Sequence, residues 1–219
     1  MTRTLYLIRH GQSDLTLGSM FDSPRGDQWD PPLSEKGREQ AELLARRLLV
    51  MDLDPFVIYS SPMRRARETA EAFAQAAGRD LALDEELIEA HIGGWEAKPF
   101  EEIVGQDPSV MHALRHQRAI WSRAPGAEDE AGFRARVRGA IERILERHPA
   151  HNLLVFAHGG VVNAYCGEVL GLPQEMFFLP HNACLNSIDV EDGSRRVRFL
   201  NDTLHLTDPS YFEPDLAER

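Results

Sequence analysis

Residues 4–14 read TLYLIRHGQSD, so an arginine, a histidine and a glycine directly follow an apolar run. The run Leu5–Ile8 is typical of a strand buried in the middle of a sheet. His10 is then either a structural histidine that ends a strand by chance or a catalytic group presented at a strand end. The pattern of the remaining chain has to separate these two interpretations.

Further apolar runs predict strands elsewhere in the chain, and helical patterns separate most of them. The predicted strands are Phe56–Tyr59, a short segment around Leu81 and Leu83, Leu153–Ala157, Leu185–Val190 and Val197–Leu200. The last two are joined by a Glu-Asp-Gly turn, which predicts a hairpin.

Caps and apolar spacing predict four helices. The first begins at Ser34 and carries Ala41, Leu44, Ala45 and Leu48 on one face; the second opens at Ser61-Pro62 and runs to about Ala77; the others run from about Asp129 to Arg147 and onward from near Val161. Strands that alternate with helices predict an α/β fold, a mostly parallel central sheet with helices on both faces. We expect one domain over residues 1–219, with a helical lid at about 91–125, where glycines and prolines interrupt short helical patterns.

Composition excludes several classes of function. The net charge of −11 disfavours a nucleic-acid or membrane-surface partner, because both need a basic face. No segment approaches the roughly 20 apolar residues of a membrane span. The two cysteines, Cys166 and Cys184, form neither a disulfide framework nor a CxxC pair, which favours a cytoplasmic protein.

Three predicted strands end in side chains that suit an anionic ligand. Arg9 and His10 follow the first strand, Arg65 lies just beyond the second, and His158-Gly159-Gly160 follows Leu153–Ala157. The carboxyl ends of parallel strands meet at one edge of a sheet, where ligands bind. We therefore expect two histidines and two arginines to converge on one crevice.

This combination of side chains suits phosphoryl transfer. Arginine binds phosphate oxygens with two donors at once, and helix N-termini add backbone N–H donors. A neutral imidazole can attack phosphorus and hold it covalently, which divides hydrolysis into two steps. Glu89, in LIEAHIGGWE, is the best carboxylate to protonate the leaving oxygen. The Gly159 backbone is a further candidate phosphate contact.

Four blocks in this order resemble the histidine phosphatase superfamily, in its phosphoglycerate-mutase-like branch. They are LIRHGQS, SSPMRRARETA, EAHIGGWE and VFAHGGVV, and weaker agreement extends from residue 5 to about 206. The resemblance implies that His10 is the nucleophile and Glu89 the proton donor. It implies that Arg9, Arg65 (rather than Arg64) and His158 bind the phosphoryl group.

The sequence departs from this family at several positions. Thr16 stands where many members carry an asparagine, Asp129 replaces a frequent serine, and Ala90 follows Glu89 where the mutases usually have arginine. An extended arginine-bearing segment typical of the mutases is not evident between Trp95 and Pro125. These departures favour hydrolysis over mutase activity.

Other reactive residues support competing chemistries poorly. His112 and His116 share i, i+4 spacing but lack a third metal ligand, so we expect no metal and no cofactor. Neither cysteine is followed six residues later by arginine, and no glycine-rich nucleotide cradle occurs.

The leading interpretation is a metal-independent phosphatase that hydrolyses small phosphomonoesters through a phosphohistidine. A phosphoglycerate-mutase-type phosphoryl transfer and a non-catalytic phosphate-binding regulatory module remain as alternatives. The expected partner is a small phosphorylated substrate, and the sequence leaves the oligomeric state open.

Overall fold

A computed structural model describes residues 2–18, 23–116, 118, 120–174 and 176–208. The strands are β1 (Arg3–Arg9), β2 (Phe56–Ser60), β3 (Leu81–Leu83), β4 (Asn152–Ala157), β5 (Leu185–Glu191) and β6 (Ser194–Asp202). The α-helices are α1 (Glu35–Leu49), α2 (Arg64–Ala77), α3 (Phe100–Gln106), α4 (Ser109–Arg115), α5 (Glu130–Arg147), α6 (Gly159–Leu170) and α7 (Leu204–Thr207). Short 3₁₀ helices are η1 (Glu85–Leu87), η2 (Gly93–Trp95) and η3 (Trp121–Arg123).

The described strands form one sheet in the order β3-β2-β4-β1-β5-β6. The neighbours β3, β2, β4 and β1 are parallel, whereas β5 runs antiparallel to both β1 and β6. Arg9 pairs with Ala157 and Ser60 with Phe156, so the ends of β1, β4 and β2 lie level at one edge. The predicted mostly parallel α/β sheet and the C-terminal hairpin are confirmed.

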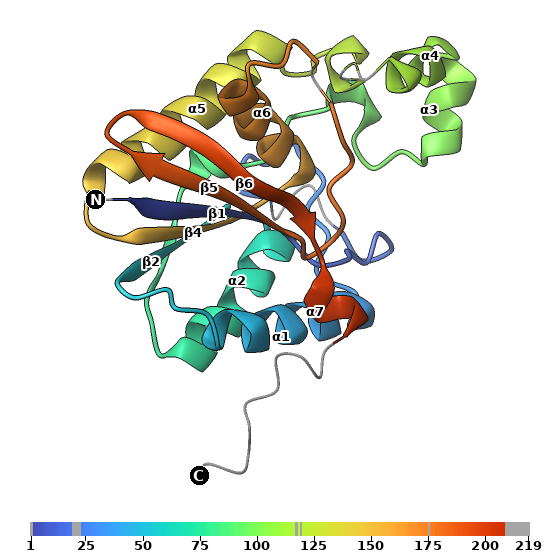
Figure 1. Ribbon diagram of the computed structural model, residues 1–219. Helices are drawn as coiled ribbons and strands as arrows, with labels where there is room; N and C mark the ends of the chain where they lie inside the picture. Colours follow the sequence, from blue (N-terminus) through green and yellow to red (C-terminus); the bar gives the residue numbers. More distant parts are fainter. Residues whose placement is uncertain (1, 19–22, 117, 119, 175, 209–219) are drawn as a thin grey trace.

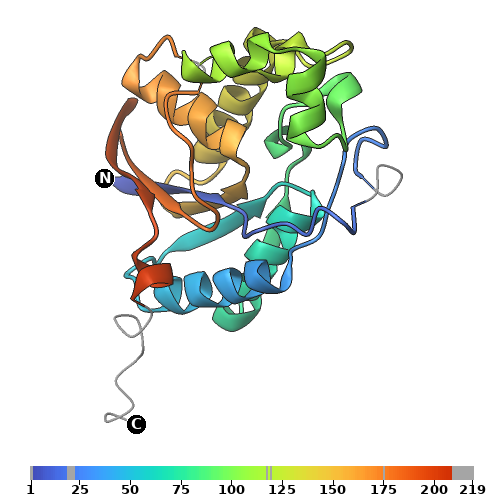
Figure 2. The same cartoon turned by 90° about the vertical axis from the view of Figure 1, so that its right-hand side faces the viewer.

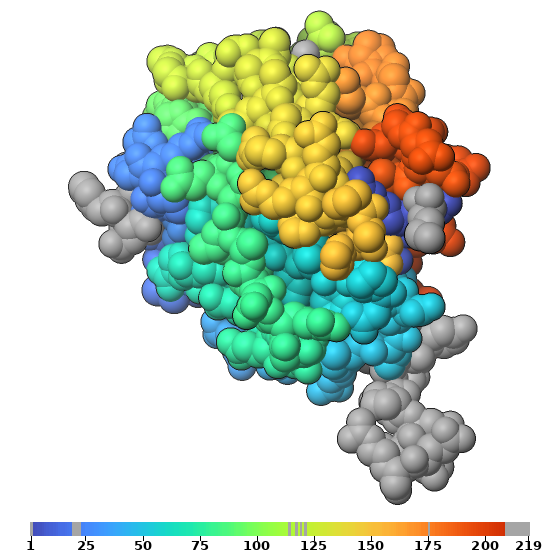
Figure 3. Space-filling view, turned by 90° about the vertical axis from the view of Figure 1, so that its left-hand side faces the viewer, coloured from blue at the N-terminus to red at the C-terminus, as the bar shows by residue number. Residues whose placement is uncertain are grey.

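Helices cover both faces of the sheet, with α5 and α6 on one side and α1, α2 and α7 on the other (Figures 1 and 2). Figure 3 shows α5, in yellow, on the outside of its layer beside the orange-red hairpin of β5 and β6. Alternate residues of β1 serve the two cores: Leu5 and Leu7 pack under α5 and α6, Tyr6 and Ile8 against α1 and α2. A strand buried on both faces needs the continuous apolar run seen in the sequence.

Two of the predicted helix starts are confirmed by side-chain caps. The Ser34 hydroxyl accepts a hydrogen bond from Gly37 N at the start of α1, and Asp129 accepts one from Gly132 N at the start of α5. These caps satisfy backbone donors that have no partner inside the helix.

The predicted cap of α2 at Ser61 is wrong. The helix begins at Arg64, and its N-cap Met63 makes no side-chain hydrogen bond. Both carboxylate oxygens of Asp30 accept the Arg64 N–H instead, at 2.9 and 3.1 Å. A carboxylate 34 positions away in the sequence thus caps α2, which local sequence patterns do not reveal.

Gly11 allows β1 and α1 to approach closely. A Cβ at Gly11 would lie 2.5 Å from the carbonyl oxygen of Gly37, and one at Gly37 would lie 2.0 Å from that of Gln12. Both distances are far below van der Waals contact, so both positions need glycine. The loop that carries His10 is therefore pressed against the first turn of α1.

The segment expected as a lid, residues 91–125, forms η2, α3, α4 and η3 within its described part. Buried Trp95, Ile103, Val110 and Ala124 give these short helices a small core of their own. Figure 1 shows α3 and α4 beyond the edge of the sheet, away from the β5–β6 hairpin. None of the described helices is long and apolar enough to cross a membrane.

The short helix α7, which the sequence pattern did not predict, is joined to α1 by a buried network. Arg47 of α1 donates to Asp202 at 2.9 Å and to Nδ1 of His205 at 3.2 Å. The His205 side chain is fully buried. Burial, and then the charge of Arg47, lower the pKa of His205 to about 4.

We predict that the free energy of unfolding falls as pH falls from 6.5 toward 4, because the unfolded chain protonates His205 and the folded chain does not. This contribution is fully present above the unfolded pKa and amounts to about 3 kcal/mol. Urea unfolding of wild type and His205→Asn at about pH 7 and about pH 4.5 measures it. An identical pH dependence in both proteins would contradict the assignment to His205.

Candidate active site

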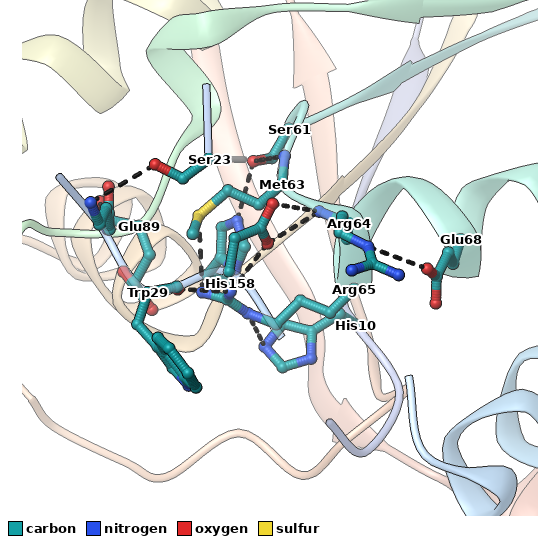
Figure 4. Close-up of polar contacts among 12 residues, drawn as sticks. His10, Ser23, Trp29, Ser61, Met63, Arg64, Arg65, Glu68, Glu89 and His158 are labelled. Atoms are coloured by element: carbon teal, nitrogen blue, oxygen red, sulfur yellow. Dashed lines mark hydrogen bonds and ion pairs between the residues drawn. The ribbon is translucent and has the colours of Figure 1, made fainter. Parts of the chain in front are cut away.

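The ends of β1, β2 and β4 bring the predicted residues together (Figure 4). The rings of His10 and His158 lie 5.3 Å apart between centroids. Arg65, in the first turn of α2, donates from Nε to Nε2 of His10 at 3.3 Å. Backbone bonds from His10 N to Ala157 and from Ser61 N to Phe156 hold the three strand ends level.

His10 is a buried, neutral imidazole whose tautomer follows from its neighbours. Nδ1 lies 2.6 Å from the carbonyl oxygen of Gly11, which can only accept, so Nδ1 carries the proton. Nε2 therefore has a lone pair, and it accepts the Nε–H of Arg65. Burial, together with the charges of Arg65 and Arg9, holds the pKa of His10 well below 6.5.

His158 is fully buried beside His10 and is anchored by the end of β2. Its Nε2 lies 2.9 Å from the Ser61 hydroxyl, and that hydroxyl also accepts Met63 N–H at 3.3 Å. Burial, followed by the charges around it, lowers the pKa of His158 well below 6.5, so this ring is also neutral. Its Nδ1 is buried and has no hydrogen-bond partner among the described residues.

Arg9 extends from the end of β1 toward the start of α6. One Nη1 hydrogen bond goes to the Pro180 carbonyl, whereas Nε is buried without a partner in the described part of the chain. A Cβ at Gly159 would lie 3.6 Å from this Nε, so the first residue of α6 is close to it. Glu89 is the main charge that opposes the lowering of the Arg9 pKa by burial.

Glu89 lies at the N-terminus of α6. Its Oε2 accepts the Gly160 N–H at 2.9 Å, and its Oε1 accepts the Ala90 N–H at 3.0 Å. Hydrogen bonds from these two backbone N–H groups fix the position of the Glu89 side chain at the helix start. A Cβ at Gly160 would lie 2.3 Å from Oε1, so the carboxylate depends on the absence of a side chain at this position.

Four of the six predicted site residues line a cavity of about 520 Å³, whereas His158 and Gly159 are not among its lining residues. Arg9, His10, Arg65 and Glu89 lie at one part of it, while the other lining residues include Leu15, Trp29, Ile92, Trp95 and Lys98. Within the described part of the expected lid, Ile92 and residues 95–99 line the cavity. A larger hollow of about 700 Å³ between α1 and α2 contains none of the predicted site residues, so size does not identify the site.

Sequence analysis gave no role to three further polar residues of the site: Gln28, Asp30 and Glu96. Gln28 donates to the carbonyl oxygens of Glu89 and Ala90 at 3.0 and 3.2 Å. Glu96 accepts the N–H groups of Trp29 at 2.8 Å and Ile92 at 3.0 Å. Gln28 and Glu96 tie the loop before α1 to the loop that carries Glu89. Glu96 ends the EAHIGGWE block, which is the sequence signal that could have identified it, whereas Gln28 and Asp30 belong to none of the four blocks.

Other residues singled out in the sequence lie elsewhere. Thr16 is exposed and bonds to Asp14, and it does not line the cavity. The ring of His112, exposed on α4, lies 4.2 Å from that of His116, which is exposed just after the helix ends. No group of three or more histidine, cysteine or acidic side chains within the described residues has the geometry of a metal site.

Comparison with known proteins agrees with this geometry. Residues 5–203 match the histidine phosphatase superfamily (branch 1). Phosphoserine phosphatase 1 of Hydrogenobacter thermophilus is 30% identical over 210 residues, covering 92% of this chain and 93% of that protein. Glucosyl-3-phosphoglycerate phosphatase of Mycobacterium tuberculosis is 32% identical over 184 residues, covering 78% of this chain and 77% of that protein.

Solved structures show the same fold. A mycobacterial glucosyl-3-phosphoglycerate phosphatase in complex with inorganic phosphate superposes with a TM-score of 0.76 at 28% identity, covering 93% of this chain and 99% of that chain. YhfR of Bacillus stearothermophilus gives a TM-score of 0.78 at 29% identity, with coverage of 93% and 99%. The chain therefore belongs to the histidine phosphatase superfamily, in its branch 1.

Proposed function

We propose that this histidine phosphatase hydrolyses small phosphomonoesters through a phosphohistidine formed on His10. The observation that carries the proposal is the state of His10: a buried, neutral ring whose Nε2 lone pair lies at the cavity, 3.3 Å from a guanidinium nitrogen of Arg65. A nucleophile for phosphorus needs this unprotonated nitrogen beside groups that neutralise phosphoryl oxygens.

Arg9, Arg65 and His158 bind the phosphoryl oxygens in this proposal, with the Gly159 backbone beside them. The buried donors Arg9 Nε and His158 Nδ1 support the assignment, because neither has a partner among the described residues. His158 offers Nδ1–H if Ser61 donates its hydroxyl proton to Nε2, which the 2.9 Å contact permits. The phosphoryl group then meets two fixed positive charges and a neutral donor.

His10 and Glu89 carry out two chemical steps and return to their starting states. The Nε2 lone pair attacks phosphorus in line, the ester P–O bond breaks, and protonated Glu89 gives its proton to the departing alcohol. Ionised Glu89 then removes a proton from a water that attacks the phosphohistidine. Phosphate leaves, and the lone pair returns to Nε2.

The substrates named for two relatives indicate a substrate class. Phosphoserine and glucosyl-3-phosphoglycerate both carry a carboxylate on the alcohol that leaves. Arg9, Arg65 and Lys98 are the arginine and lysine residues among the described cavity lining. Because Arg9 and Arg65 bind the phosphoryl group in this proposal, we assign Lys98 to binding a carboxylate on the leaving group. Its ion pair with Glu102, 3.3 Å long and partly exposed, is weak enough to exchange.

Ile92 and residues 95–99 line the leaving-group side of the cavity, which supports the role of the 91–125 segment as the lid of a single domain. Cys166 and Cys184 are buried and free, which supports a cytoplasmic location.

A direct test compares phosphate release with isomerisation. Purified protein receives phosphoserine, glucosyl-3-phosphoglycerate or 3-phosphoglycerate, the last with and without a bisphosphorylated primer. We expect phosphate release that needs no primer and survives chelation. Primer-dependent isomerisation would establish a mutase, and phosphate-ester binding without turnover would establish a regulatory module.

His10→Ala should lower kcat at least about 1,000-fold while the protein stays folded, because the variant has no nucleophile. Acid-labile, base-stable phosphate bound to wild-type protein after a rapid quench should disappear in the variant. His112→Ala, an exposed change on α4, is the matched control and should keep full activity. Substantial turnover by His10→Ala would disprove the mechanism.

Gly160→Ala should displace the Glu89 carboxylate, since the new Cβ would lie 2.3 Å from Oε1. We expect kcat/KM, which reports phosphoryl transfer to His10 and not the later hydrolysis of the phosphohistidine, to fall about 10- to 100-fold for an alkyl phosphate and far less for p-nitrophenyl phosphate, whose leaving group needs little protonation. Gly139→Ala on α5, where a Cβ meets nothing within 4 Å, is the control. Equal losses for both substrates would contradict the role of Glu89 as acid.

Lys98→Gln should raise KM about tenfold for phosphoserine and leave KM for glycerol phosphate nearly unchanged, because only phosphoserine carries a carboxylate on its alcohol. Lys36→Gln, on the exposed side of α1, should change neither value. Equal KM shifts for both substrates in Lys98→Gln would refute carboxylate recognition by this residue.

A further inference from the structure

Asp30 is a buried carboxylate with no role in the reaction steps above. It lies in the loop before α1, and its side chain is 1% exposed. A carboxylate at such depth is costly unless charges and hydrogen bonds compensate it. Its partners therefore indicate why it is there.

The partners of Asp30 are two successive residues of α2. Both carboxylate oxygens accept the Arg64 N–H, and Oδ1 lies 3.5 Å from Nη1 of Arg65. The first contact caps α2, whose own N-cap residue makes no side-chain hydrogen bond. The second reaches the guanidinium that donates to His10 (Figure 4). One carboxylate thus contacts both the helix start that carries Arg65 and the side chain of Arg65.

An arginine side chain has many rotamers, and ordering it costs conformational entropy. Asp30 and the Trp29 carbonyl, at 3.5 Å, both face Nη1, while Nε points to His10. Anchoring the Nη1 end sets the orientation of the planar guanidinium, and with it the donors offered at the cavity. This orientation exists before any phosphate arrives.

We propose that Asp30 is a positioning residue that orients Arg65 for the phosphoryl group and for His10. The inference rests on the proposed function, in which Arg65 binds phosphate. Asp30 touches neither substrate nor reacting atoms, so it acts through Arg65.

Glu68, on α2, offers a matched control for the substitution of Asp30. Its carboxylate lies 3.7 Å from Arg64 Nε and accepts the Leu33 N–H at 2.8 Å, so it too joins a guanidinium and a backbone group. Neither of these two contacts involves Arg65. Glu68→Gln thus measures how much kcat/KM changes when a carboxylate with a comparable structural role is lost.

The test is a double-mutant cycle between Asp30→Asn and Arg65→Gln, followed by kcat/KM and by the inhibition constant of inorganic phosphate. Asparagine keeps one oxygen for the Arg64 N–H and loses the charge that faces Arg65. We expect Asp30→Asn to lower kcat/KM about 30-fold and to weaken phosphate inhibition similarly. In the Arg65→Gln background, the same change should lower kcat/KM by less than about threefold. Glu68→Gln should stay within about twofold of wild type.

Equal losses from Asp30→Asn in both backgrounds would show a merely structural role and overturn the inference. So would unchanged kcat/KM in Asp30→Asn. An Arg65→Gln protein with wild-type kinetics would instead overturn the assignment of Arg65, and the inference with it. If Asp30→Asn does not fold, Asp30→Glu keeps the charge and moves it by one methylene. A loss of kcat/KM of at least about tenfold is expected there, and wild-type kcat/KM would overturn the proposal.

Discussion

Parallel pairing of β4 with both β1 and β2 is the constraint on which the rest of the structure depends. The register places Arg9 beside Ala157 and Ser60 beside Phe156, so three strands end at one level. His10, Arg65 and His158 come from distant parts of the chain and meet only because of that register. The Gly11–Gly37 contact then presses the His10 loop onto α1, and this leaves the loop little freedom.

Charge balance is the second condition for such a site. Burial, and then the charges of two arginines beside it, lower the pKa of His10 and keep its ring neutral. The same positive charges must be compensated when no phosphate is bound. Asp30 opposes Arg65, and Glu89 acts on both Arg9 and Arg65. Each of these carboxylates also accepts a backbone N–H at a helix start, Asp30 at α2 and Glu89 at α6. The starts of α2 and α6 thus hold Asp30 and Glu89 in place beside the arginines.

Much of this arrangement could be predicted from residue patterns. The runs Leu5–Ile8 and Leu153–Ala157 are apolar throughout because both faces of the central sheet are covered, and this indicated a parallel α/β core. Since parallel strands share an edge, the residues that follow them could be grouped into one site from their positions in the chain. The predicted start of α2 was wrong because its cap comes from Asp30 rather than from Ser61.

The sequence by itself determined the main strands, the four long helices, the parallel core and the polar side chains that follow the strand ends, since these depend on periodicity and on chain order. Only the tertiary structure decided how those side chains are held. The tautomer of His10 follows from the Gly11 carbonyl and Arg65, and the place of Glu89 follows from the Gly160 N–H. Gln28, Asp30 and Glu96 were missed because each makes its connecting hydrogen bond to a residue 34 or more positions away: Glu89, Arg64 and Trp29 respectively. Contacts of that kind leave no periodic trace in the chain.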